Sequence, residues 1–96
     1  MGAGVKYRVE VRADAWHRIT PGPRSGEWQL VTQVLEDGQR LYVELWRYPW
    51  TATLQVAVAR IEQAVTTRTG SQQWRTLTIL RPEALDLVEV PAPDER

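Results

Sequence analysis

The stretch EWQLVTQVLEDGQRLYVELWRY, residues 27–48, carries the strongest structural signal in the chain. Asp37-Gly38 separates two runs that are rich in β-branched and aromatic residues, and this dipeptide is typical of a two-residue hairpin turn. Both residue types tolerate the positive φ angles that such a turn needs. The stretch therefore predicts an antiparallel hairpin made of strands 27–36 and 39–48.

A turn of this kind also predicts which residues of the two strands face each other. With Glu36 opposite Gln39, the aliphatic residues of the second strand share one side of the hairpin, where the facing pairs are Val34 with Leu41, Thr32 with Val43, Leu30 with Leu45 and Trp28 with Arg47. The other side carries an aromatic row and several polar residues, namely Tyr42, Trp46, Tyr48, Arg40, Glu44, Gln29 and Gln33. A register shifted by one residue would place glutamines beside the leucines, so we predict the first arrangement.

Two further segments alternate between apolar and polar residues as strands do. Residues 5–13, VKYRVEVRA, place Val5, Tyr7, Val9 and Val11 on one side. Residues 74–81, WRTLTILR, predict a strand whose Leu77 and Ile79 join the core. After it, Pro82 begins PEALDLVEV, which fits either a short helix or an edge strand.

Residues 51–69, TATLQVAVARIEQAVTTRT, fit two descriptions. Leu54, Val58, Ile61 and Val65 are spaced four, three and four residues apart, which is the stripe of an amphipathic helix. Alternation and the many β-branched residues favour a strand instead, which would add a member to the sheet. The helical spacing is the longer pattern, with Thr51 as N-cap and Gly70 as stop, so we predict a helix.

These segments predict an α+β fold in the order β-β-β-α-β. A single amphipathic helix would cover one face of an antiparallel meander, giving two layers. Residues 1–90 would form one small domain, and residues 91–96, PAPDER, a flexible tail. The hairpin side with the leucines would lie under the helix, and the aromatic side would lie open.

The composition removes several classes of function. The 96 residues include no cysteine, so disulfide frameworks, thiolate nucleophiles and Cys-ligated metals are excluded. The formal net charge is zero, which gives no general attraction to nucleic acid or to a membrane surface. No apolar run approaches the roughly 18 residues that a membrane helix needs. We expect a cytoplasmic protein that does not bind membranes.

Residues 14–26 predict a surface loop that holds the only histidine. Asp14 and His17 are close in sequence and could in principle exchange protons, but no nucleophile, base and orienting group can be assembled around them. One histidine without cysteine does not make a transition-metal site. No phosphate-binding glycine pattern is present. We therefore predict no catalytic, metal or cofactor-binding residues, and His17 as a loop residue.

The open aromatic side of the hairpin is the candidate site. Exposed rings edged by polar groups mark interaction surfaces, and Tyr, Trp and Arg are enriched where interfaces hold most of their energy. We predict a non-catalytic interaction module, a homodimer or a partner-docking protein, with the contact residues Tyr42, Trp46, Tyr48, Arg40, Arg8 and Gln29. The alternative is a protein that stacks single-stranded nucleic acid on the same rings and meets its phosphates with arginine.

Overall fold

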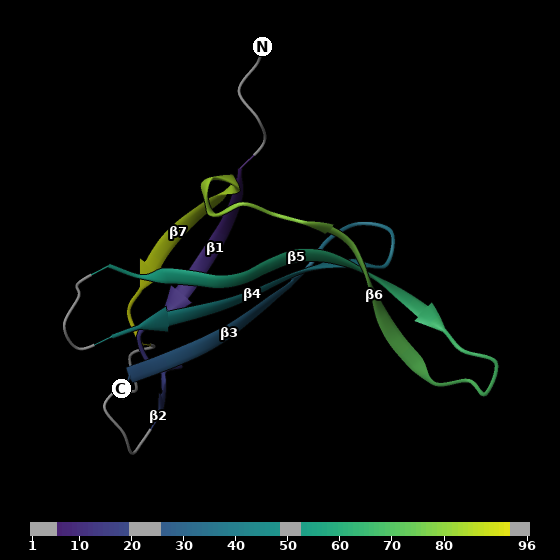
Figure 1. Cartoon of the computed structure of the whole chain (residues 1–96), viewed down its shortest axis with the longest axis horizontal. Helices are drawn as coiled ribbons and strands as arrows, with labels where there is room; N and C mark the ends of the chain where they lie inside the picture. Colours follow the sequence, from purple (N-terminus) through teal and green to yellow (C-terminus); the bar gives the residue numbers. More distant parts are fainter. Residues whose placement is uncertain (1–5, 20–25, 49–52, 93–96) are drawn as a thin grey trace, which may run out of the picture.

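The chain folds almost entirely into β-strands (Figure 1). The computed structural model describes residues 6–19, 26–48 and 53–92, and these ranges hold no α-helix. One short 3-10 helix, η1 (Pro82–Ala84), follows the sixth strand. The seven strands are β1 (Tyr7–Arg12), β2 (His17–Ile19), β3 (Gly26–Val34), β4 (Gln39–Arg47), β5 (Gln55–Thr66), β6 (Gln72–Ile79) and β7 (Leu85–Val90).

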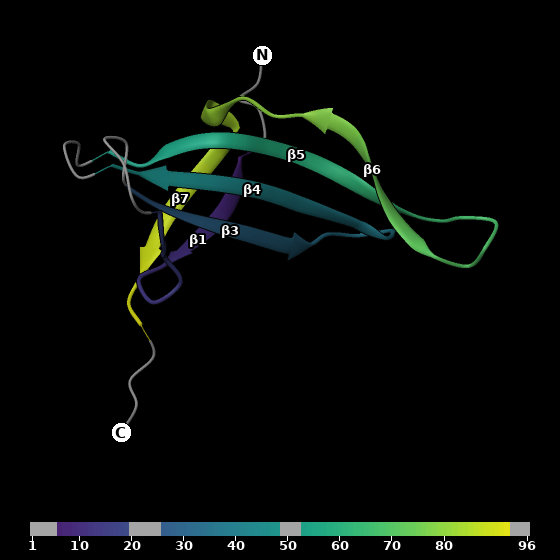
Figure 2. The ribbon, with the colours of Figure 1, turned by 60° about the horizontal axis from the view of Figure 1, so that its bottom comes forward.

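The strands form two layers. β2, β3, β4, β5 and β6 make an antiparallel sheet in which every strand pairs with its neighbours in the sequence. β1 and β7, from opposite ends of the described chain, pair in parallel. Figure 2 shows this pair crossing the long strands of the sheet. The antiparallel sheet is confirmed, but the predicted first strand lies outside it, as β1. The predicted α+β class is wrong because a strand pair, rather than a helix, covers the sheet.

The core lies between the strand pair and the sheet. Its buried side chains come from both layers: Val9, Val11 and Leu85 from the pair, and Leu41, Val43, Leu45, Ala59 and Ile61 from the sheet. The predicted aliphatic row of β4 is therefore buried, as expected from its alternation. Burial of such side chains from water supplies most of the favourable free energy of folding.

The predicted helix over 51–69 is wrong, since residues 55–66 form the longest strand of the sheet. A β-bulge interrupts the alternation of this strand. Glu44 pairs with Val58 and Leu45 with Val56, so Ala57 is an extra residue. The bulge sets the core-facing Val56 and Ala59 three residues apart. The predicted helical stripe does not lie on one side of β5, because Val58 faces Glu44 on the outer side and Ile61 faces Leu41 on the core side. Thr51, the proposed N-cap, lies outside the described residues.

The Asp37-Gly38 turn is confirmed, but the predicted register of the hairpin is wrong by one residue. Both turn residues have positive φ, 60° and 74°. The N–H of Leu35, rather than that of Glu36, donates to the Gln39 carbonyl at 2.8 Å. Compared with the predicted hairpin, the first strand has one extra residue beside the turn. This bulge places every side chain of β3 on the side opposite to the predicted one.

The shifted register places two glutamines of β3 on the core side. Gln29 pairs with Leu45 and Gln33 with Leu41, the arrangement that the sequence disfavoured. Gln29 is buried, and its carboxamide both accepts from and donates to the backbone of Arg12. Gln33 donates to the carbonyl of Arg8 at 2.9 Å. These bonds satisfy the polar groups that the register buries, so it carries little penalty.

β6 lies outside the core. The predicted strand over 74–81 is present, but all eight residues of β6 are exposed, and the predicted burial of Leu77 and Ile79 is wrong. β5 and β6 continue as a hairpin past Gln39, the first residue of β4 (Figure 1). The radius of gyration is 15.7 Å, against roughly 12–13 Å for a compact domain of this length. The segment after Pro82 combines both predicted forms, a short 3-10 helix and then a strand.

Candidate interaction surface

One side of the five-stranded sheet faces away from β1 and β7, and we call it the outer face. Facing residues of antiparallel strands share a side, so its members follow from the register. In β4 they are Arg40, Tyr42, Glu44 and Trp46, and their partners in β3 are Val34, Thr32, Leu30 and Trp28. β5 adds Val58, Arg60 and Glu62, and β6 adds Trp74 and Ile79.

The predicted contact residues do not all lie on this surface. Tyr42, Trp46 and Arg40 belong to the outer face, and Tyr48 stacks on Trp46 with ring centroids 6.1 Å apart. The two remaining residues are elsewhere. Gln29 is buried on the core side because of the shifted register, and Arg8 lies on β1, in the other layer, with its side chain near Glu10.

Trp28 was expected on the core side, and the same shift moves it to the outer face. Trp28 pairs with Trp46 there, and the centroid of the His17 ring lies 4.9 Å from that of the Trp28 ring. Leu30 and Val34 also change sides and become exposed. Trp50 lies outside the described residues. The sequence contains no local signal for the bulge beside Leu35. For this reason Trp28, Leu30 and Val34 could not be placed from the pattern alone.

The centre of the outer face is a network of arginines, rings and one buried carboxylate. Glu62 is 3% exposed, and its two oxygens accept from Arg40 at 2.8 Å and from Arg60 at 2.7 Å. The Arg40 guanidinium also lies 3.9 Å from the ring centroid of Trp74, and that of Arg60 lies 4.5 Å from that of Tyr42. These contacts hold the side chains at the centre of the outer face in one arrangement.

Tyr42 is tied to the same network through its hydroxyl. The phenol donates to the Glu44 carboxylate at 2.7 Å. This hydrogen bond, burial and the negative charge of Glu44 together raise the pKa of Tyr42 above its ordinary value of 10.0.

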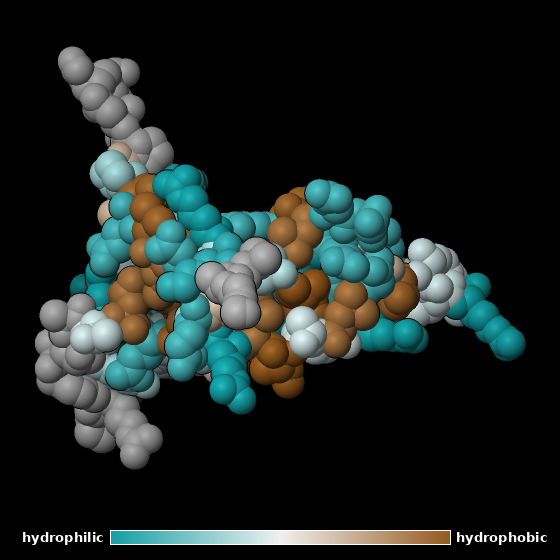
Figure 3. All heavy atoms as spheres, turned by 90° about the horizontal axis from the view of Figure 1, so that it is seen from above, coloured by the Kyte–Doolittle hydropathy of each residue, from teal (hydrophilic) through white to brown (hydrophobic). Residues whose placement is uncertain are grey.

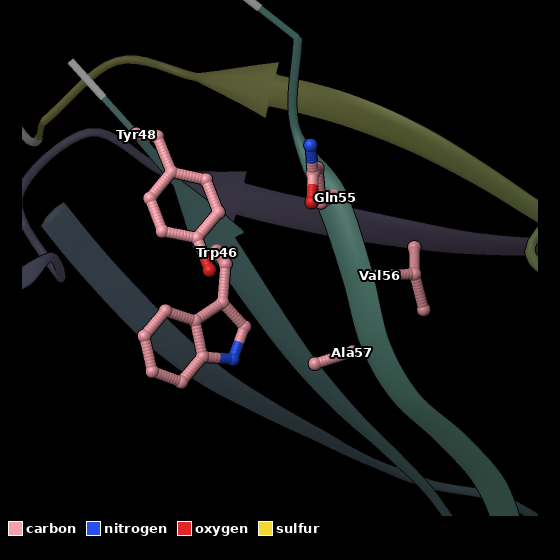
Figure 4. Close-up of a pocket in the computed structure, with 5 residues that line it drawn as sticks. All are labelled: Trp46, Tyr48, Gln55, Val56 and Ala57. Atoms are coloured by element: carbon pink, nitrogen blue, oxygen red, sulfur yellow. The ribbon is translucent and has the colours of Figure 1, made fainter. Parts of the chain in front are cut away.

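A shallow hollow lies where Trp46 and Tyr48 meet β5. It encloses about 270 Å³ between the two rings, Gln55, Val56 and Ala57. Figure 4 shows the rings one after the other along β4, with Gln55 and Ala57 on the neighbouring strand. Ala57, the extra residue of the β-bulge, lines this hollow with a small side chain.

The outer face also exposes aliphatic side chains. Val34 is 91% exposed and Ile79 is 79% exposed, and Leu30 and Trp74 are about half as exposed. Figure 3 shows one side of the molecule, with apolar patches between polar ones over both of its halves. These exposed apolar side chains make the outer face the candidate contact surface of the molecule.

The predicted surface loop over 14–26 is wrong at His17, which belongs to the strand β2 and pairs with Trp28 of β3. Asp14 accepts two hydrogen bonds from Arg12, at 3.0 and 2.9 Å, and these hold the pKa of its carboxyl below the ordinary value. The ring of His17 lies against that of Trp28 at an interplanar angle of 31°. Among residues 6–19, 26–48 and 53–92, no three metal-ligating side chains gather in one place. No helix in these ranges is long and apolar enough to span a membrane.

Comparisons with protein-family models, with curated proteins and with solved structures found no match to this chain.

Proposed function

We propose that the chain is a non-catalytic protein-interaction module that self-associates through the outer face of its sheet. The observation that carries this proposal is the exposure of Val34 and Ile79 on that face, beside a rigid network of arginine and aromatic side chains. Two outer faces brought together would remove these side chains from water, and the partly exposed rings with them. The proposed location is the cytoplasm, as the sequence predicts.

The charges of the outer face favour a second copy as the partner. Arg40 and Arg60 are matched by Glu62 and Glu44 on the same surface, so the face carries no excess of either sign. The whole chain is also formally neutral. A neutral face does not repel its own copy, and it gives no attraction to a partner of strong opposite charge.

The same contacts argue against single-stranded nucleic acid. Binding of that kind depends on arginines that are free for phosphates and on rings that are free for bases. Here Arg40 and Arg60 both bind Glu62, and their guanidinium groups lie over the rings of Trp74 and Tyr42. A nucleic acid would have to displace these contacts before it could form its own.

Sedimentation velocity over a range of concentrations tests the proposal. The wild type should gain mass from low micromolar concentration upward, and Leu30→Ser/Val34→Ser should do so only at roughly tenfold or more higher concentration. The control is Val88→Ser, which changes the same kind of side chain on β7, in the other layer. Trp46→Ala should also weaken the association, because it removes a ring that stacks on Tyr48.

Two results would overturn this function. One is a wild type that stays monomeric at every concentration. The other is a fluorescence change on adding a single-stranded oligonucleotide that weakens with salt, in a protein whose mass does not depend on Leu30 and Val34.

A further inference from the structure

β6 forms one edge of the five-stranded sheet. In the described part of the chain, no strand pairs with the edge of β6 that points away from β5. A free edge presents a row of backbone N–H and C=O groups that can bind another strand. All residues of β6 are exposed, so this edge is accessible along its whole length.

The other edges of the molecule differ from β6 in ways that prevent pairing. β2 has three residues, and very short edge strands are poor templates. The free side of β1 is occupied by the carboxamides of Gln29 and Gln33. β7 carries two acidic residues, Asp86 and Glu89, among its six.

The sequence of β6, QQWRTLTI, has none of these features. Its single charged residue is Arg75, and it contains no lysine, proline or acidic residue. Threonine, tryptophan and isoleucine also favour strands. β6 is thus the one described edge that combines length, accessibility and a low charge, which is the combination that natural proteins avoid unless the edge is used.

The register shows which backbone N–H and C=O groups of β6 point away from β5, toward the free edge. Ala64 donates its N–H to the Gly38 carbonyl at 3.0 Å, on the side away from β6. In an antiparallel pair bonded and non-bonded positions alternate, so Trp74, which faces Ala64, turns its own N–H and C=O away from β5. Gln72 and Thr76, two residues to either side, do the same. A bulge at Leu77 ends this regular edge.

We propose that β6 pairs with β6 of a second copy, antiparallel and edge to edge, to join two five-stranded sheets. A twofold axis at Trp74 places the two tryptophans opposite each other and Gln72 opposite Thr76 of the second copy. Arg75 then faces Gln73 of the other chain, so no like charges meet. An axis at Arg75 would set two guanidinium groups against each other, which destabilises the pairing. This contact is separate from the outer face and does not rest on it.

The test compares Thr76→Pro with Thr76→Ala in sedimentation velocity of the whole chain. Proline removes an N–H that faces solvent in one copy but binds a carbonyl in the pair, and edge strands tolerate it at such a position. Thr76→Ala keeps the N–H and should associate like the wild type. Thr76→Pro should keep its circular dichroism spectrum and weaken edge pairing by roughly tenfold or more.

Leu30→Ser/Val34→Ser serves as a background in which only the edge contact is left. In that background the pair of copies should still form, and adding Thr76→Pro should remove it. A mixture of Gln73→Cys and Arg75→Cys chains should form a mixed disulfide faster than either variant links to itself, because the chain has no other cysteine.

Equal masses for Thr76→Pro and Thr76→Ala, or no excess of the mixed disulfide, would overturn the edge contact. The outer-face contact would then still be judged by the loss caused by Leu30→Ser/Val34→Ser alone.

Discussion

The side chain of Gln29 on β3 binds both backbone groups of Arg12 on β1 and so joins the two layers of the molecule. The Arg12 N–H donates to Oε1 at 2.9 Å, and Nε2 donates to the Arg12 carbonyl at 3.0 Å. Because β7 pairs with the other side of β1, the carboxamide takes the place that a neighbouring strand would have. A glutamine with 1% exposure is thereby fully satisfied.

Replacing Gln29 with leucine should lower the free energy of unfolding by about 1–3 kcal/mol, because the Arg12 N–H and carbonyl lose their partners. Urea denaturation followed by tryptophan fluorescence measures the change. Gln33→Leu is the matched control, since Gln33 makes one exposed bond to the Arg8 carbonyl, and its loss should stay below about 1 kcal/mol. Equal losses in the two variants would show that Gln29 does not join the layers in this way.

Replacing Glu62 with alanine should lower the free energy of unfolding by about 2–3 kcal/mol, because two guanidinium groups lose their common carboxylate. The expected loss is smaller than for wholly buried pairs, since Arg40 and Arg60 keep side-chain exposures of 24% and 35%. The control is Glu10→Ala, whose pair with Arg8 is exposed and 3.6 Å long, and it should change stability by less than about 0.5 kcal/mol. Chemical denaturation of both variants decides the point, and a similar small change in each would contradict the role given to Glu62.

The raised pKa of Tyr42 should be visible in a spectrophotometric titration. Ionisation would place a phenolate beside the Glu44 carboxylate, so Glu44→Gln should bring the pKa of Tyr42 down toward 10.0. The Tyr42 signal is obtained as the difference in tyrosinate absorbance between each protein and its Tyr42→Phe variant. An unchanged titration in Glu44→Gln would show that the hydrogen bond is not the cause.

The same shift in the pKa of Tyr42 predicts how stability depends on pH. The folded chain holds this proton at higher pH than the unfolded chain, whose tyrosine loses it near 10. The contribution to stability is therefore complete below about pH 10 and is lost as the pH rises through the folded pKa. The difference in unfolding free energy between the wild type and Tyr42→Phe should fall over that range and stay constant at lower pH.

Gly38→Ala should cost about 1–2 kcal/mol, because φ at this position is 74°, in the left-handed region. A Cβ there would also lie 3.1 Å from Nε2 of Gln63, which donates to the Asp37 carbonyl. Gly70→Ala is the control, since its φ is 89° but a Cβ would have no atom within 4 Å. Thermal unfolding should show the larger drop in Tm for Gly38→Ala, and the reverse order would remove Gln63 from the explanation.

Local chemistry was enough to locate several elements of this fold. Asp37-Gly38 placed the turn, because few other residue pairs accept two successive positive φ angles. The alternation in β4 correctly separated the buried Leu41, Val43 and Leu45 from the outer-face Tyr42 and Trp46, since side chains alternate along any strand. For the polar network around Tyr42, alternation predicted only that Arg40, Tyr42 and Glu44 share one side of a strand. It did not predict which groups form hydrogen bonds or ion pairs.

The bulges and the parallel pair of β1 and β7 depend on contacts between distant residues. A bulge adds one residue at small local cost, so its presence is determined by what the shifted side chains meet, such as the Arg12 backbone at Gln29. The β-bulge at Ala57 likewise interrupts the alternation of β5. Tyr7 and Leu85 pair across almost the whole chain, and no pattern within either segment specifies that partner. Whether each residue faces the core or the outer face was therefore settled by packing between the layers, because a shift of one residue moves a side chain from one side of a sheet to the other.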